Sequence, residues 1–134
     1  MKIKIAELEL IMIQILTSKH YTAKEASKIA EVFLYAEVSG KNTQGLLKLL
    51  GSEPAQNIKP KYKSKIIKET KVSALIDGGG SAGPLSAQFA SDKVVKIAKK
   101  NGIAIVGMNN TFSSVGALGF YVRKIAQHDL IGIV

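Results

Sequence analysis

A glycine-rich run separates a predicted strand from a predicted helix, and it constrains the fold of this 134-residue chain more than any other feature. The run is Asp77-Gly78-Gly79-Gly80-Ser81-Ala82-Gly83, and the five residues before it are apolar enough to form a strand. Pro84 follows the run and is suited to the first turn of a helix, which we expect to reach Lys100. The chain therefore contains a strand–loop–helix unit, which is typical of an α/β protein.

The same run matches the dinucleotide-binding pattern G-x-G-x-x-G through Gly78, Gly80 and Gly83. Three features argue against a Rossmann unit. The strand before the run is expected to be the second strand of a hairpin, Pro84 lacks a backbone N–H for a phosphate, and no acidic residue follows the next strand to bind a ribose. No Gly-Lys-Ser/Thr closes the run either, so a P-loop is excluded. The other interpretation is a tight strand-to-helix connection beside the wall of a site.

Three helical patterns occupy the first part of the chain, and we take residues 1–58 as an N-terminal helical part. Thr22 and Glu25 form a capping-box pattern before the second helix, and Gly40 is suited to a left-handed stop after it. Residues 1–5 alternate lysine with apolar side chains, as in a short edge strand or an extended lead-in. The predicted helices cover residues 6–17, 23–38 and 42–50.

Strands and helices alternate in the rest of the chain. Strands are expected over residues 62–68, 72–76, 103–106 and 130–134, the last two buried, with helices over 84–100 and 116–127 and a polar turn over 109–114. Nothing follows residues 130–134 that would pair with that strand or cover it. We therefore expect residues 59–134 to be the start of a β/α domain that is incomplete at its C-terminal end.

Composition excludes several classes of site. The chain has no cysteine, and His20 and His128 lack the spacing of metal ligands, so disulfides, thiolate sites and zinc sites are not expected. The longest apolar run, residues 10–16, is too short to cross a bilayer, and no cleavage site for a signal peptide follows it. We expect a cytoplasmic protein with no membrane association.

The formal net charge of +9 raises the question of nucleic-acid binding. Arg123 is the only arginine, although arginine is the residue favoured for base recognition and stacking. One local cluster combines six lysines with Glu69 and a single aromatic residue, Tyr62; the lysines are Lys59, Lys61, Lys63, Lys65, Lys68 and Lys71. The cluster favours a solvated or anion-steering surface, and a basic protein that binds nucleic acid or acidic partners remains the alternative.

Seven segments share their order and spacing with a known family; they are residues 36–50, 58–60, 66–69, 74–78, 102–106, 116–121 and 130–133. Together they resemble the N-terminal part of the type-2 malate/L-lactate dehydrogenases, the sulfolactate dehydrogenase-like NAD(P)-dependent oxidoreductases. The resemblance covers nearly the whole chain. It implies a non-Rossmann α/β fold, a homodimer, NAD or NADP as cofactor, and a small 2-hydroxy or 2-oxo acid as substrate.

The resemblance also assigns site residues, and here this chain departs from the family pattern. The family's Ser-His-Gly appears as Thr43-Gln44-Gly45, so the acid/base histidine falls on Gln44, and the arginine that holds the substrate carboxylate falls on Lys48. A second family histidine falls near Ser113 and Ser114. The resemblance thus implies catalytic positions at Gln44 and Ser114, with Thr43, Lys48 and Ser113 binding substrate.

These substitutions keep polar groups but remove the groups that titrate near neutral pH. Two explanations stay open: a subfamily with another proton donor and another substrate, or a relative that no longer catalyses the reaction. Apart from the resemblance, the residues themselves favour a solvated helix face for Gln44 and Lys48. The residues that bind the cofactor are not identified, and the sequence does not distinguish NAD from NADP.

Overall fold

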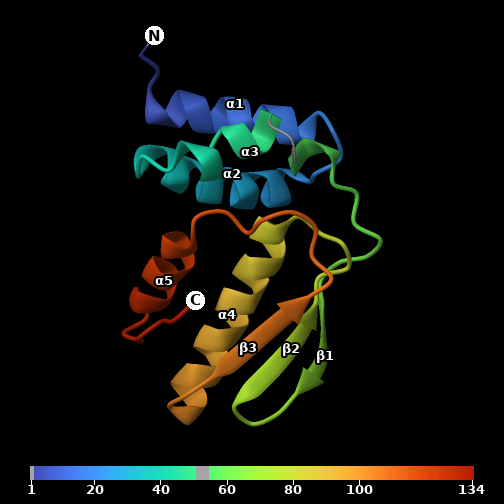
Figure 1. Ribbon diagram of the computed structural model, residues 1–134, viewed down its shortest axis with the longest axis vertical. Coiled ribbons are helices and arrows are strands. Elements are labelled where there is room, and N and C mark those ends of the chain that lie inside the picture. Colours follow the sequence, from blue (N-terminus) through green and yellow to red (C-terminus); the bar gives the residue numbers. More distant parts are fainter. Residues whose placement is uncertain (1, 51–54) are drawn as a thin grey trace.

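The computed structural model describes residues 2–50 and 55–134 and confirms a mixed α/β fold. Its helices are α1 (Ile5–Thr17), α2 (Ala23–Val38), α3 (Leu47–Leu50), α4 (Gly83–Asn101) and α5 (Leu118–Ala126), and its strands are β1 (Lys65–Glu69), β2 (Ser73–Asp77) and β3 (Ile105–Asn109). Short 3-10 helices lie at Asn42–Gln44 and Ala55–Asn57. Figure 1 shows α1, α2 and α3 gathered at one end of the molecule, with the sheet, α4 and α5 at the other.

The helical end is held by the packing of α1 against α2. Met12 and Leu16 from α1 and Ile29 and Phe33 from α2 are buried in one apolar cluster, because these residues recur at the helical period. The predicted capping box is confirmed at the start of α2. The Thr22 hydroxyl accepts the Glu25 N–H, and the Glu25 carboxylate accepts the Thr22 N–H, so that two N–H groups at the helix start are satisfied.

The sheet has the order β1-β2-β3. Strands β1 and β2 pair antiparallel, which confirms the predicted hairpin, and β2 pairs parallel with β3 through the α4 crossover. The α4 helix covers one face of the sheet, where Ala74 and Ile76 of β2 are buried. The carboxyl ends of β2 and β3 therefore lie side by side, and the loop that follows each strand begins at the same edge.

Several predicted boundaries were wrong. The first three strands begin later than expected: β1 runs over 65–69 rather than 62–68, β2 over 73–77 rather than 72–76, and β3 over 105–109 rather than 103–106. The third predicted helix is divided into a 3-10 turn and α3, because Gly45 between them has the non-helical ψ of −124°. The last helix starts at Leu118, after an extended segment that ends at Ala117.

The two apolar segments predicted to be buried strands, residues 103–106 and 130–134, are exposed over much of their length. Ile105 is 70% exposed, because β3 is an edge strand with α4 on only one of its faces. Residues 130–134 form no strand, and Ile131 is 97% exposed. The boundary at residue 58 stays a prediction. No helix in the described part of the chain combines the length and apolarity that a membrane span requires.

Candidate functional site

Two polar side chains far apart in the sequence meet where the helical end contacts the sheet end. The Ser114 hydroxyl donates to the Gln44 side-chain oxygen at 3.3 Å across 70 residues of sequence. Gln44 ends the 3-10 turn after α2, and Ser114 lies in the loop between β3 and α5. That loop passes between the helical layer and the start of α4 (Figure 1). The structure thus brings together the two positions at which the resemblance placed the family histidines.

Gln44 is held by a close contact between its turn and α2. Gly45 is buried, and a Cβ at this position would lie 3.0 Å from the Glu37 backbone nitrogen and 3.1 Å from the Phe33 carbonyl oxygen. The Glu37 carboxylate accepts the Leu46 N–H at 3.0 Å. A side chain directly after Gln44 would have to move the turn away from α2 by a few tenths of an ångström, so this close contact favours glycine there.

Ser114 is held from the other side by α5. The buried Tyr121 hydroxyl donates to the Val115 carbonyl oxygen, which fixes the residue after Ser114. Burial raises the pKa of Tyr121 well above its ordinary value, so the phenol stays protonated and keeps this bond. Ser113 adopts a left-handed φ of 64°, which directs the chain through a sharp turn just before Ser114.

The glycine-rich run forms the floor beneath this loop. A Cβ on Gly83 would lie 2.5 Å from the Ser114 carbonyl oxygen, and a Cβ on Gly78 would lie 2.7 Å from the Thr111 methyl carbon. Cβ atoms essentially never lie this close to a non-bonded heavy atom, so only glycine allows the two loops to approach this closely. The run therefore serves as a tight strand-to-helix connection against the loop that carries Ser114.

The backbone N–H groups of the glycine-rich run already donate hydrogen bonds within the chain. Their partners show whether the run could bind the pyrophosphate of a dinucleotide. Those of Gly78, Gly80 and Gly83 donate to carbonyl oxygens of the β3–α5 segment, at Asn109, Asn110 and Phe112, with distances of 2.8–2.9 Å. The Gly79 N–H donates to the Asp77 carboxylate at 2.9 Å. A pyrophosphate needs these donors free, so the run does not fit the phosphate cradle of a Rossmann unit.

Asp77 joins three segments at this edge of the sheet. Its carboxylate accepts the Gly79 N–H, the Tyr62 hydroxyl at 2.8 Å and the Asn110 side-chain amide at 2.8 Å. These three donors lower the pKa of Asp77, and the Gly79 N–H has the largest effect. The hydrogen bond that the Tyr62 hydroxyl donates to Asp77 raises the pKa of Tyr62. Sequence reasoning did not identify this network. Its signal was an aspartate placed directly between a strand and the glycines.

Of the remaining predicted residues, Ser113 contacts the pair, because its hydroxyl donates to the Ser114 carbonyl oxygen at 3.4 Å. Thr43 and Lys48 are close to Gln44 in sequence, and among the described residues neither makes a hydrogen bond to the pair. Lys48 is half-buried on α3, four residues after Gln44, Ser113 is half-buried and Thr43 is exposed. No salt bridge of Lys48 occurs in residues 2–50 or 55–134. His20 and His128 are exposed outside the site, and in the described ranges no three His, Asp or Glu residues gather as a metal site would require.

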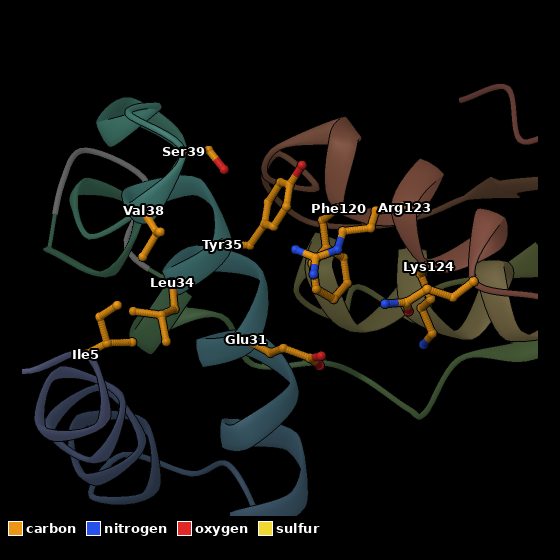
Figure 2. A pocket seen from close by; sticks show the side chains of 10 residues that line it. Ile5, Glu31, Leu34, Tyr35, Val38, Ser39, Phe120, Arg123 and Lys124 are labelled. Carbon is orange, nitrogen blue, oxygen red and sulfur yellow. The ribbon is translucent and has the colours of Figure 1, made fainter.

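The predicted lysine cluster lies on β1 and the segments on either side of it, and all six lysines are exposed. Lys65 lies over the Tyr62 ring, with its Nζ 4.6 Å from the ring centroid. Arg123 is elsewhere, in a groove of about 460 Å³ between α2 and α5. Figure 2 shows Arg123 there beside Phe120, across from Tyr35. This groove contains none of the predicted site residues.

The chemistry available to the central pair is hydrogen bonding. Gln44 accepts from Ser114 through its oxygen, which leaves its amide N–H groups as donors. Neither an amide nor an aliphatic hydroxyl exchanges a proton readily near neutral pH. The pair can therefore orient and polarise a ligand oxygen, but it does not itself supply a titrating acid or base.

Comparisons with known proteins agree with the resemblance. A sequence model described as malate/L-lactate dehydrogenase matches residues 3–134. The ureidoglycolate dehydrogenase (NAD(+)) of Escherichia coli O157:H7 is 29% identical over 116 residues, which are 82% of this chain and 32% of that protein. The L-sulfolactate dehydrogenase of Methanocaldococcus jannaschii is 29% identical over 126 residues, 92% of this chain and 36% of that protein.

The fold has a solved counterpart in malate dehydrogenase from Entamoeba histolytica. That structure superposes with a TM-score of 0.86 at 23% identity, over 96% of this chain and 36% of the other. The chain spans about a third of the length of the curated relatives that it matches.

Replacing Gly83 by alanine should displace the loop that carries Ser114, because the new Cβ would lie 2.5 Å from a backbone oxygen. We expect Gly83→Ala to lower the free energy of unfolding by about 1–3 kcal/mol in urea titrations. The ¹⁵N NMR signals of the Ser114 backbone and the Gln44 side-chain amide should shift. Gly107→Ala is the matched control, since its Cβ would have only an ordinary 3.4 Å contact. Equal changes in unfolding free energy and in these NMR signals for the two variants would refute the claim that Gly83 positions the loop carrying Ser114.

The Asp77 network should give the protein a pH-dependent stability. The pKa of Asp77 is lower in the folded chain than its unfolded value of about 3.9, so its stabilising contribution is present above that pH and is lost as the pH falls through the folded pKa. Urea midpoints of the wild type and Asp77→Asn should differ at pH 6 and converge below pH 4. Asp129→Asn, at an exposed position outside the network, should show no such convergence.

Proposed function

The chain belongs to the malate/L-lactate dehydrogenase family, and on that premise we propose that it is the N-terminal part of an oxidoreductase. The reaction interconverts a small 2-hydroxy acid and its 2-oxo acid with NAD or NADP. The enzyme acts as a homodimer in the cytoplasm. Relatives named for malate, sulfolactate and ureidoglycolate support the substrate class, because each of these compounds is a 2-hydroxy acid.

The hydrogen bond between Ser114 and Gln44 carries this proposal. The resemblance assigns both positions to the reacting end of the substrate, yet they come from parts of the chain 70 residues apart. Close contacts of Gly45 and Gly83 hold the two segments against their neighbours, so the pair is built into the fold. A surface role would need neither of these glycine contacts.

In the proposed site, Gln44 and Ser114 contact the oxygen that changes between alcohol and carbonyl. The Gln44 amide donates to that oxygen, and the Ser114 hydroxyl fixes the amide in this orientation. Lys48, four residues further on in α3, pairs with the substrate carboxylate as a point charge. Thr43 and Ser113 complete the rim with hydroxyl groups.

The nicotinamide cofactor does not bind through the glycine-rich run in this proposal, because the N–H groups of that run donate within the chain. The cofactor site therefore belongs to residues other than 78–83. We assign no residue of this chain to it.

A second candidate function is that of a non-catalytic relative. It is favoured by one observation: the groups at the two histidine positions, an amide and a hydroxyl, have no proton to exchange near neutral pH. Such a protein would still bind the 2-oxo acid, so binding and turnover have to be measured separately.

Binding is tested by titrating the ¹⁵N-labelled chain with sodium pyruvate or oxaloacetate. We expect saturable shifts of the Gln44 side-chain amide and the Ser114 backbone signal. Lys48→Gln should weaken binding about tenfold or more, because a charge-assisted hydrogen bond is worth roughly 1.5–3 kcal/mol. Lys41→Gln removes an exposed charge just before the same turn and is the control. Equal affinities of the two variants would exclude Lys48 as the carboxylate partner.

Turnover is tested in a chimera that joins this chain to the part of the M. jannaschii sulfolactate dehydrogenase following the aligned region. We expect oxidation of NADH or NADPH with some member of a 2-oxo acid panel. Gln44→His should add an inflection near pH 6.5 to the rate profile and raise the rate by about 10²-fold or more, since it restores a titrating acid. Gln44→Asn, which leaves an amide, is the control.

The outcomes of this experiment separate the two candidates. Turnover of the unmodified chimera supports the enzyme. Turnover only after Gln44→His, or after Gln44→His together with Ser114→His, identifies a non-catalytic relative. A chimera that stays inactive in every form overturns the proposed reaction.

A further inference from the structure

The groove between α2 and α5 has the size and lining of a small-molecule site. Its volume of about 460 Å³ falls within the range of roughly 300–1,000 Å³ that is typical of ligand pockets. Leu34 and Val38 of α2 and Phe120 of α5 give it an apolar lining, and Figure 2 shows polar side chains among them. Ligand pockets combine such apolar contact with a few polar groups that orient the ligand.

Two aromatic side chains fix the shape of the groove where the helices meet. The rings of Tyr35 and Phe120 pack edge to face, with centroids 5.7 Å apart and an interplanar angle of 71°. A Cβ on Gly119 would lie 2.8 Å from the Tyr35 hydroxyl oxygen, so the glycine leaves space for this tyrosine. Phe120 is buried and also packs edge to face on Tyr121. The aromatic lining is therefore formed without a ligand, which lowers the cost of binding one.

The Tyr35 hydroxyl is a donor that the protein itself does not use in its described part. The hydroxyls of Tyr21, Tyr62 and Tyr121 each donate to an oxygen of the protein. No such hydrogen bond of Tyr35 occurs in residues 2–50 or 55–134, although its side chain is half-buried. A hydroxyl in this position is able to donate to a ligand in the groove.

Arg123 brings a second donor group to the same groove. It is the only arginine among the 19 lysine and arginine residues of the chain. Figure 2 shows its guanidinium beside Phe120, on the side that faces Tyr35. Its neighbour Lys124 bonds to Asp92 at 2.7 Å, whereas no ion pair of Arg123 occurs among the residues that the structure describes. The planar guanidinium has paired N–H groups that match the two oxygens of a carboxylate.

The charges around the groove favour a ligand with a single negative charge. Arg123 and Lys124 contribute two positive charges, and Asp92 compensates the charge of Lys124. The Glu31 carboxylate also lines the groove, from the α2 side. It would repel a second negative charge on the ligand. One anionic group with an apolar body therefore suits this lining better than a dianion does.

We propose that the groove between α2 and α5 binds a small monocarboxylate with an aromatic or branched aliphatic body. The Arg123 guanidinium pairs with the carboxylate, and the Tyr35 hydroxyl donates to it. The apolar body packs on Phe120, between Leu34 and Val38. This site shares no residue with the proposed 2-oxo acid site, and it does not depend on the proposed function.

The experiment titrates the ¹⁵N-labelled chain with sodium phenylacetate and follows the NMR signals of the Gly119 backbone and the Arg123 Nε–H. We expect saturable shifts with a dissociation constant in the millimolar range, as is usual for so small a ligand. Acetate keeps the carboxylate without the ring, and benzyl alcohol keeps the ring without the carboxylate. Each should bind about tenfold more weakly or worse, because one half of the contact is lost. Phenyl phosphate, mostly a dianion at pH 8, should also bind more weakly than phenylacetate.

Two substitutions test the role of the guanidinium. Arg123→Gln should weaken phenylacetate binding about tenfold or more, because it removes the partner of the carboxylate. Lys100→Gln is the matched control, since it removes one positive charge at an exposed position of α4 outside the groove. Circular dichroism checks that both variants remain folded, and the ligand series on the wild type tests the site without any substitution.

Four results would overturn the proposal. These are the absence of saturable shifts at Gly119 and Arg123, equal affinities of phenylacetate and any of the other three compounds, equal affinities of the two variants, and shifts confined to Gln44 and Ser114. A homodimer that Arg123→Gln dissociates, detected by light scattering, would identify a second copy as the occupant and would also overturn it. Because phenylacetate has no 2-oxo group, its failure to bind leaves the proposed function standing.

Discussion

The close packing of the glycine-rich run against the β3–α5 loop is the contact on which the rest of this structure depends. At Gly78 and Gly83 the two segments approach so closely that a single methyl group would separate them. The approach lets the N–H groups of the run bond to carbonyl oxygens of the facing loop. That bonding fixes the start of α4 and the course of residues 110–116, and through them the position of Ser114 beside Gln44.

Much of the architecture could be predicted from local patterns. The capping box at Thr22, the hairpin before the glycines and the helix after them depend on residues close in sequence, and all three are present. Burial was harder to predict. The apolar residues 103–106 predict a buried strand, but the burial of a strand depends on its neighbours in the sheet, and β3 is an edge strand.

The candidate site shows a different limit of sequence reasoning. Gln44 and Ser114 were identified only through a family resemblance, because a glutamine and a serine 70 residues apart form no motif. The Asp77 network was missed for the opposite reason. Its residues are common polar types, and nothing in their spacing indicates that Tyr62 and Asn110 converge on one carboxylate. The glycines are visible in the sequence, but the sequence does not show that their backbone N–H groups are used in hydrogen bonds within the chain.

The contact between Ser114 and Gln44 also couples folding to the site. One partner belongs to the helical end and the other to a loop that exists only after β2, α4 and β3 have assembled. Contacts of such long sequence separation form late, after the loop-closure entropy has been overcome. Partial opening of either end would separate the pair before the core melts. The Ser114–Gln44 hydrogen bond therefore reports on the docking of the two ends of the molecule, and a loosened junction would break it in a chain that still has native helices and strands.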